Sequence, residues 1–159
     1  MRQLPTGGLF QLGYVSADIE RAIALYRDRY GVREFLRINS RALSPPGAHG
    51  PFLDLALAYT GDLMIELIQP DACDPGIYGD ALRSDGRLSL HHLGYLVEPD
   101  RFATLAEDCR GSGVAVPARF DNAGVAVLFA DTRPDTGLFS EYVRAGDAVK
   151  QFFASIPRN

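Results

Sequence analysis

Apolar and polar residues alternate over several short stretches of this chain, and two of these stretches are near copies. Phe10 to Val15 and Leu90 to Val97 share the core L-G-Y, and their alternation predicts two half-buried strands. Three strand-like stretches follow in each half. They cover 34–39, 52–59 and 63–69 in the first half, and 116–120, 125–130 and 138–144 in the second.

Each L-G-Y strand is followed by apolar residues at helical spacing. In the first copy Ser16 or Asp18 caps the predicted helix, and Gly31 ends it. In the second copy Pro99 opens the helix and Gly111 closes it. The apolar residues of each helix lie on one side, which predicts that each helix packs on a sheet.

The two halves repeat one another in the order β-α-β-β-β. "QLGYVSADIERAIALYRDRYGV" matches "HLGYLVEPDRFATLAEDCRGSGV", and "TGDLMIELIQ" matches "DTGLFSEYVR". Because one four-stranded sheet with one helix leaves a face to bury, the halves are expected to pair in an α+β fold. The expected organisation is one domain with four parts: a first βαβββ module over 8–70, a linker over 71–89, a second module over 90–145 and a C-terminal helix over 146–159.

Four polar side chains hold matched places in the two modules. Since residues two apart share a face of a strand, each has apolar or small neighbours on its own face. They are Gln11 and Glu66 in the first module, and His92 and Glu141 in the second. An ionised carboxylate on an apolar face is costly, and two that share a cavity repel each other.

A divalent cation would relieve both costs, and one imidazole with carboxyl and amide oxygens is a suitable ligand set. A single glutamate on a strand is more commonly a surface residue, and a single histidine a structural one. The repeat that aligns all four favours a shared metal site. His91 faces the other way and is expected to be structural, and His49 lies in a proline- and glycine-rich loop and is expected to be exposed.

The remaining charged and reactive residues give weaker indications. Cys73 and Cys109 are 36 positions apart, which does not suit a two-cysteine metal site, so both are expected to be free thiols. Arg37 and Arg144 lie on predicted strands, where each is either a solvated surface charge or a contact for a substrate carboxylate or phosphate.

Composition narrows the function classes. The chain has 159 residues, 47% of them hydrophobic and 23% charged, as in soluble globular proteins. A formal net charge of -4 gives no broad attraction to nucleic acid or to anionic membranes, so neither is expected as a partner. No apolar run approaches the roughly 20 residues of a membrane span. The start "MRQLPTGG" lacks the apolar core of a signal peptide, and a cytoplasmic location is expected.

The paired modules with Gln11/Glu66 and His92/Glu141 resemble the vicinal oxygen chelate superfamily. That group includes glyoxalase I, methylmalonyl-CoA epimerase, extradiol dioxygenases, fosfomycin-resistance enzymes and bleomycin-binding proteins. The resemblance covers about residues 10–144. It implies that the two modules form a pair of cupped half-barrels, with a metal at the bottom that binds two adjacent oxygens of a small-molecule substrate. It also implies a homodimer.

Members of the superfamily can be distinguished at the ligand positions. Extradiol dioxygenases, fosfomycin-resistance enzymes and the epimerase have histidine where this chain has Gln11, and bleomycin-binding proteins lack the ligand set. The four residues match one glyoxalase I group, but Val15 and Pro70 replace the arginine and asparagine of that enzyme, which disfavours a glutathione hemithioacetal. "LALAYTGDLMIELIQP" is most similar to uncharacterised glyoxalase-like proteins.

The resemblance implies a metal-dependent lyase or isomerase, of glyoxalase or epimerase type. In such an enzyme a proton is abstracted next to a carbonyl and the metal stabilises the enediolate. Glu141 is expected to be the base and Glu66 its partner for reprotonation. Zinc, nickel, cobalt, manganese and magnesium all suit the ligands. Apolar neighbours of the four residues are expected either to line the substrate pocket or to pack the barrel: Met64, Ile68, Leu96, Phe139 and Val143.

Two other functions remain open at this point. The first is a small-molecule binding or resistance protein that has the fold without turnover. The second is a non-haem iron dioxygenase, which the glutamine at position 11 disfavours.

Overall fold

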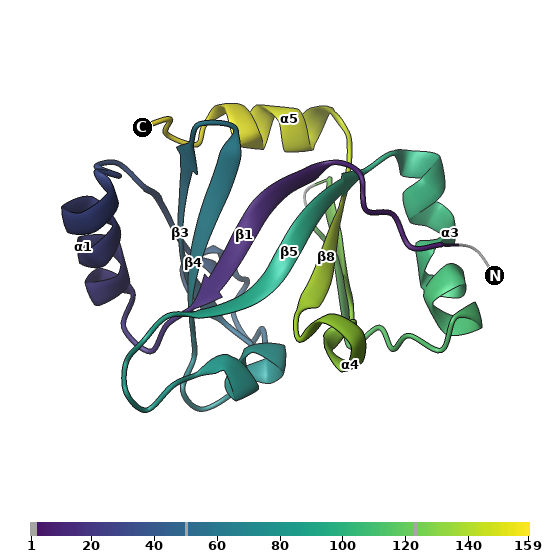
Figure 1. The fold of residues 1–159 in the computed structure, drawn as a ribbon, viewed down its shortest axis with the longest axis horizontal. Helices are drawn as coiled ribbons and strands as arrows, with labels where there is room; N and C mark the ends of the chain where they lie inside the picture. The colour runs from purple at the N-terminus through teal and green to yellow at the C-terminus, as the bar shows by residue number, and fades with distance from the viewer. Residues whose placement is uncertain (1–2, 50, 123) are drawn as a thin grey trace. The chain divides into compact units, whose positions relative to one another are not determined.

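The computed structural model describes residues 3–49, 51–122 and 124–159, and its elements follow the duplicated order (Figure 1). The first half contains β1 (Leu9–Val15), α1 (Ile19–Tyr30), β2 (Leu36–Asn39), α2 (Ser40–Leu43), β3 (Leu53–Thr60), β4 (Leu63–Pro70) and the 3-10 helix η1 (Gly76–Ala81). The second half contains β5 (Ser89–Val97), α3 (Pro99–Gly111), β6 (Ala118–Asn122), β7 (Val125–Ala130), α4 (Arg133–Thr136), β8 (Phe139–Arg144) and α5 (Asp147–Ala154).

The strands form one eight-stranded sheet in the order β2-β3-β4-β1-β5-β8-β7-β6. The chain divides into two compact units. The α1 unit comprises Leu12–His91 with Ile156–Asn159, and the α3 unit comprises His92–Ser155 with the residues up to Gln11. The α+β fold with tandem βαβββ modules is confirmed.

In the α1 unit, one side of α1 packs on β3 and β4. Ala22, Ile23 and Tyr26 are buried against residues of these strands, including Ala56 and Leu67. The Asp18 side chain accepts a hydrogen bond from the backbone N–H of Arg21, and Gly31 ends the helix at φ 71°. Both ends of α1 are therefore set by the residues that the sequence predicts.

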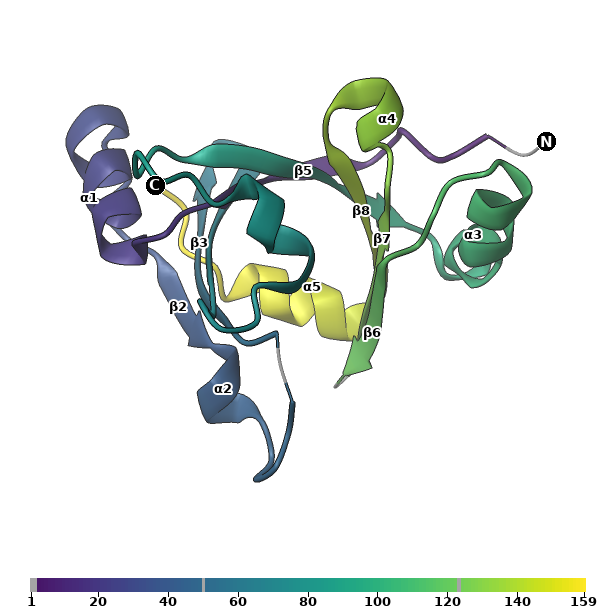
Figure 2. The ribbon, with the colours of Figure 1, turned by 90° about the horizontal axis from the view of Figure 1, so that it is seen from below.

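In the α3 unit, α3 packs on β7 and β8, which lie beside it in Figure 2. Phe102, Leu105 and Cys109 of the helix are buried against a cluster that includes Leu128 and Tyr142. Burial raises the pKa of the Cys109 thiol, and neither cysteine forms a disulfide. These thiols are free, as expected.

Three local features differ from the sequence-based expectations. The segment between the predicted strands 34–39 and 52–59 contains α2, and the expected linker contains η1. The last residue of α3 is Gly111, and the left-handed residue that follows the helix is Gly113, at φ 74°. None of the helices in the described ranges is long and apolar enough to cross a membrane.

Candidate metal centre

Strand alternation in the α3 unit separates a helix-facing side of the sheet from a side that carries polar residues. Tyr95 and Tyr142 stack at a ring distance of 5.6 Å on the side that packs against α3. His92, Gly94 and Glu141 therefore point to the opposite face. The parallel register of β5 and β8 sets Gly94 next to Glu141.

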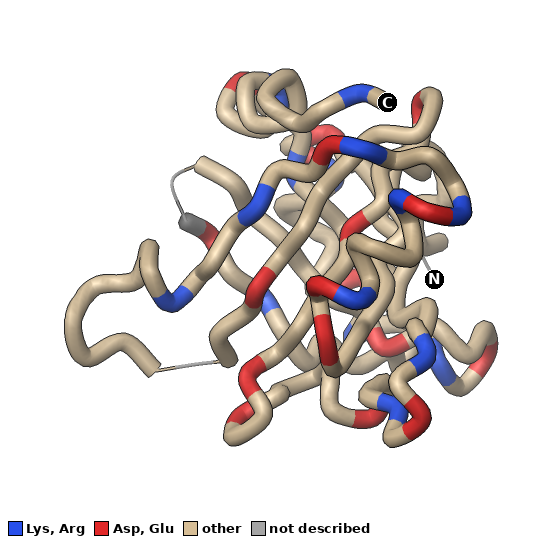
Figure 3. The backbone as a smooth tube through the Cα atoms, turned by 90° about the vertical axis from the view of Figure 1, so that its left-hand side faces the viewer, with Lys and Arg blue, Asp and Glu red and all other residues tan. Residues whose placement is uncertain are grey.

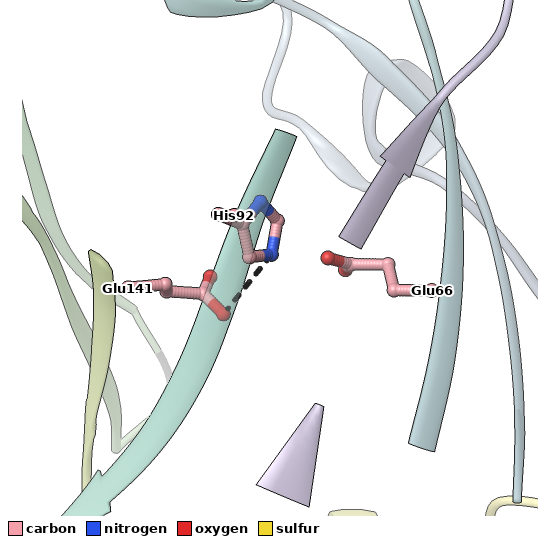
Figure 4. A group of neighbouring side chains, drawn as sticks. All are labelled: Glu66, His92 and Glu141. Carbon is pink, nitrogen blue, oxygen red and sulfur yellow. Dashed lines mark ion pairs between the residues drawn. The ribbon is translucent and has the colours of Figure 1, made fainter. Parts of the chain in front are cut away.

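His92 and Glu141 lie close together on this face. Nε2 of His92 is 3.5 Å from Oε2 of Glu141, a contact drawn as a dashed line in Figure 4. His92 is fully buried and Glu141 is 7% exposed. The His92 and Phe129 rings are nearly perpendicular, with their centroids 5.2 Å apart. The pair is thus held in apolar surroundings, where an isolated carboxylate is costly.

Gly94 leaves room for the side chains around it. A Cβ at this position would lie 2.7 Å from Oε1 of Gln11 and 3.2 Å from Oε2 of Glu141. These two oxygens are consequently no more than 5.9 Å apart, the sum of the two distances. Gln11 is itself buried, at 5% exposure. The glycine of the repeated L-G-Y motif therefore opens the space that the amide and the carboxylate occupy.

The donors on this face fit a divalent cation. Oε2 of Glu141 is buried and accepts no hydrogen bond from the residues that the structure describes. Two ligands of one ion, at bond lengths of about 2.0–2.2 Å, are separated by about 2.8–3.6 Å. The distance of 3.5 Å between His92 and Glu141 is within this range. An imidazole nitrogen, a carboxylate and an amide oxygen are all ligands that divalent metals accept.

The other predicted ligand and the predicted pocket residues are distributed over both units. Glu66 lies on β4 of the α1 unit, half-buried, and pairs with Leu57 on β3. Ile68 packs against Val15 and Tyr78, so η1 covers this part of the strand. The other predicted pocket residues are Met64, Phe139 and Val143, which are buried, and Leu96, which is half-buried.

The remaining histidines and arginines occupy structural or surface positions. His91 lies against Tyr78 at a ring distance of 4.8 Å, and its Nε2 is 3.1 Å from the carbonyl oxygen of Ile77. His49 is exposed. Arg37 forms an ion pair with Glu20 at 2.6 Å and Arg144 one with Asp121 at 3.6 Å, at the surface in both cases.

Phe129 is a neighbour of the site that sequence reasoning missed. It pairs with Glu141 across β7 and β8, and its ring meets both His92 and Phe139. The run "VAVLFA" is apolar throughout, so it does not show which of its residues faces the histidine. Only the register of β7 against β8 identifies Phe129.

Comparison with known proteins supports this architecture. A sequence model described as the Glyoxalase/Bleomycin resistance protein/Dioxygenase superfamily matches residues 10–133. No curated protein matches the chain.

Solved structures with the same fold include proteins of three bacteria. A hypothetical protein of Bacillus halodurans C-125 is 17% identical, with 90% of this chain and 97% of that chain covered and a TM-score of 0.64. A Streptomyces coelicolor methylmalonyl-CoA epimerase variant, in complex with 2-nitronate-propionyl-CoA, is 20% identical, with coverages of 88% and 98% and a TM-score of 0.62. The Mycobacterium tuberculosis epimerase is 19% identical, with coverages of 94% and 97% and a TM-score of 0.59. The TM-scores show a shared fold, and at identities this low the likeness shows the fold alone.

Proposed function

Because this chain belongs to the glyoxalase/bleomycin resistance protein/dioxygenase superfamily, we propose that it is a metal-dependent lyase or isomerase that moves a proton next to a substrate carbonyl. The observation that carries the proposal is the buried contact of 3.5 Å between His92 and Glu141 on an apolar face. Such a contact is costly for a structural role alone and is suited to holding a cation.

Four residues would hold the cation: Gln11, Glu66, His92 and Glu141. The proposal for Glu66 is supported by its place in the repeat, because it stands on the last strand of the first module where Glu141 stands on the last strand of the second. Two carboxylates would balance the two positive charges of the ion. When bound, the cation would act as a Lewis acid toward the substrate carbonyl.

The chain's own residues carry the proton transfer. The carboxylate of Glu141 takes the proton from the carbon next to the carbonyl, and the electron pair of the broken C–H bond moves toward the carbonyl oxygen. For reprotonation, Glu66 would carry a proton taken from water and give it to that carbon from the opposite face of the substrate, so that Glu141 ends protonated and Glu66 ionised. The low exposure of Gln11, His92 and Glu141 keeps water away from the reacting carbon, which strengthens the electrostatic interactions there.

The proposed substrates are acyl thioesters and 2-oxo compounds, in which a carbonyl lies next to an exchangeable C–H. Two of the structures with the same fold are of methylmalonyl-CoA epimerase, which supports acyl thioesters as the substrate class. Val15 and Pro70, at the positions where glyoxalase I with this ligand set has arginine and asparagine, support the exclusion of a glutathione adduct.

Metal analysis tests the proposal. Protein purified without chelator and without a nickel column is expected to contain nearly one divalent ion per chain. The His92→Ala variant is expected to lose it, and the His49→Ala variant, which removes an exposed loop histidine, is expected to retain it. Failure to bind any divalent metal after reconstitution would contradict the proposal.

Proton exchange then separates the two functions that remain. Incubation in D2O with acyl thioesters and 2-oxo compounds should place deuterium next to the carbonyl, as detected by NMR. A protein that binds metal and these compounds without exchange would instead be a binding protein of the same fold.

A further inference from the structure

The α1 unit contains a pocket that the proposed reaction does not use. It has a volume of about 430 Å³ and lies between α1 and the segment that leads into β5. This size is typical of small-ligand sites. The wall includes the rings of Tyr14, Tyr26 and Tyr30 and the side chains of Arg21 and Arg87.

The pocket and the candidate metal centre use opposite faces of β1. Tyr14 packs against the cluster beneath α1, whereas Gln11, an odd number of residues away, points to the other face. The pocket wall includes none of the four proposed metal ligands. A ligand bound there would therefore contact a different set of residues from the proposed metal ligands.

One side of the pocket is aromatic. The rings of Tyr14 and Tyr26 are 6.2 Å apart, and those of Tyr26 and Tyr30 are 5.2 Å apart. This row runs from the buried Tyr26 to Tyr30, which is 69% exposed. Burial raises the pKa of Tyr26, so its hydroxyl stays neutral. An exposed ring at the end of such a row offers a flat surface on which a planar group can stack.

The other side of the pocket is cationic. The guanidinium of Arg21 lies against the backbone at Gly86, where an added Cβ would be 2.4 Å from Nη1. Gly86 has φ 71°, so both its conformation and this close approach favour glycine. Arg21 forms no ion pair with any residue in the described ranges, which makes its charge available to a ligand.

The charge of Arg87 is only partly balanced. Its Nε is 3.3 Å from Oδ2 of Asp85, and the same carboxylate oxygen is 2.7 Å from Nη2 of Arg83. One negative charge thus serves two guanidinium groups. In Figure 3, which faces the side of the molecule where α1 lies, basic and acidic positions are interspersed. The pocket wall itself contains two arginines and no acidic residue.

We propose that this pocket binds an aromatic phosphate, with its ring on Tyr30 and its phosphate between Arg21 and Arg87. Guanidinium groups donate paired hydrogen bonds to phosphate oxygens, and the pocket wall contains no carboxylate that would repel the anion. A nucleotide and a simple aryl phosphate share this chemistry.

Calorimetry with phenyl phosphate tests the site. A comparison with AMP distinguishes a nucleotide from a simple aryl phosphate as the ligand. Phenyl phosphate is expected to bind, and to bind about tenfold more weakly to the Arg21→Gln variant, because a hydrogen bond to a charged group is lost. Arg27→Gln, an exposed change on the same helix, should leave the affinity unchanged. Tighter binding of AMP than of phenyl phosphate would indicate a nucleotide.

The ring and the location are tested separately. Inorganic phosphate should bind about tenfold more weakly than phenyl phosphate, and Tyr30→Ala should remove most of that difference, since the ring then has no aromatic surface on which to stack. In a 15N-labelled sample, phenyl phosphate should shift the amide resonances of Gly86 and Arg87. The proposal is wrong if phenyl phosphate does not bind at millimolar concentration, or if Arg21→Gln and Arg87→Gln leave its affinity unchanged.

Discussion

Glu141 and Glu66 hold matched positions on the last strands of the two modules, but their surroundings differ. Glu141 is 7% exposed, faces His92 and lies beside the space that Gly94 leaves open. Glu66 is half-buried, and Leu57 is its partner on the next strand. The two modules therefore share one scaffold, while the buried members of the polar cluster lie in the α3 unit.

The two helices differ in a similar way. Asp18 caps α1 with a hydrogen bond of 3.0 Å to the backbone N–H of Arg21. At the start of α3, Glu98 forms no capping hydrogen bond, and Pro99 occupies the first turn. Equivalent positions of a repeat can thus stabilise the same element by different means, which allows their contributions to be measured against one another.

The largest expected effect distinguishes the two glutamates. With a chiral acyl thioester in D2O, Glu141→Gln should lower the rate of deuterium incorporation by about 10²–10⁴-fold, because the proposed base is lost. Glu66→Gln should retain deuterium incorporation and lose inversion at the carbon, because the proton then returns on one side only. NMR measures the exchange and chiral chromatography the inversion.

Metal content must be determined for both variants, since both residues are proposed ligands. If each variant retains its metal and both lose exchange equally, the division of roles between Glu141 and Glu66 is wrong.

The next largest effect is expected from filling the space beside Gly94. Gly94→Ala would place a methyl group 2.7 Å from Oε1 and 2.8 Å from Cβ of Gln11, so these atoms must move. Overpacking of this kind costs about 1–3 kcal/mol of the free energy of unfolding, and the variant should also bind metal more weakly. Urea unfolding and metal titration measure the two effects.

Gly111→Ala is the matched control on α3. Nothing lies within 4 Å of a Cβ at this position, and its φ is not positive. Alanine should be neutral there or stabilise the protein by up to about 1 kcal/mol. An equal loss of stability in both variants would show that the space around Gly94 is not what matters.

Alternation and the internal repeat were enough to predict most of the strands and the residues of the buried cluster. The bounds of β7 match the predicted ones, and those of β4 extend one residue further. Alternation also predicts which strand face His92 and Glu141 share with apolar or small neighbours, because side-chain direction along a strand follows from position alone.

The features that were missed depend on contacts distant in sequence or on very short elements. The backbone N–H groups of Arg33 and Glu34 donate to the Asn159 side chain, so β2 begins at Leu36 instead of Glu34. The helices α2 and η1 have four and six residues, too few to show a period. The pocket between Arg21 and Arg87 brings together residues that share no local pattern.

The smallest expected effect compares the starts of the two helices. Asp18→Ala should lower the free energy of unfolding by about 1 kcal/mol, because the backbone N–H of Arg21 loses its acceptor. For a domain of this length that corresponds to a decrease in Tm of about 2–4 °C. Glu98→Ala should change stability by less than about 0.5 kcal/mol, since its side chain forms no capping hydrogen bond. Asp18→Asn, which keeps an acceptor oxygen, should retain most of the free energy of unfolding that Asp18→Ala loses. Equal effects of Asp18→Ala and Glu98→Ala in thermal unfolding would mean that capping does not distinguish the two modules.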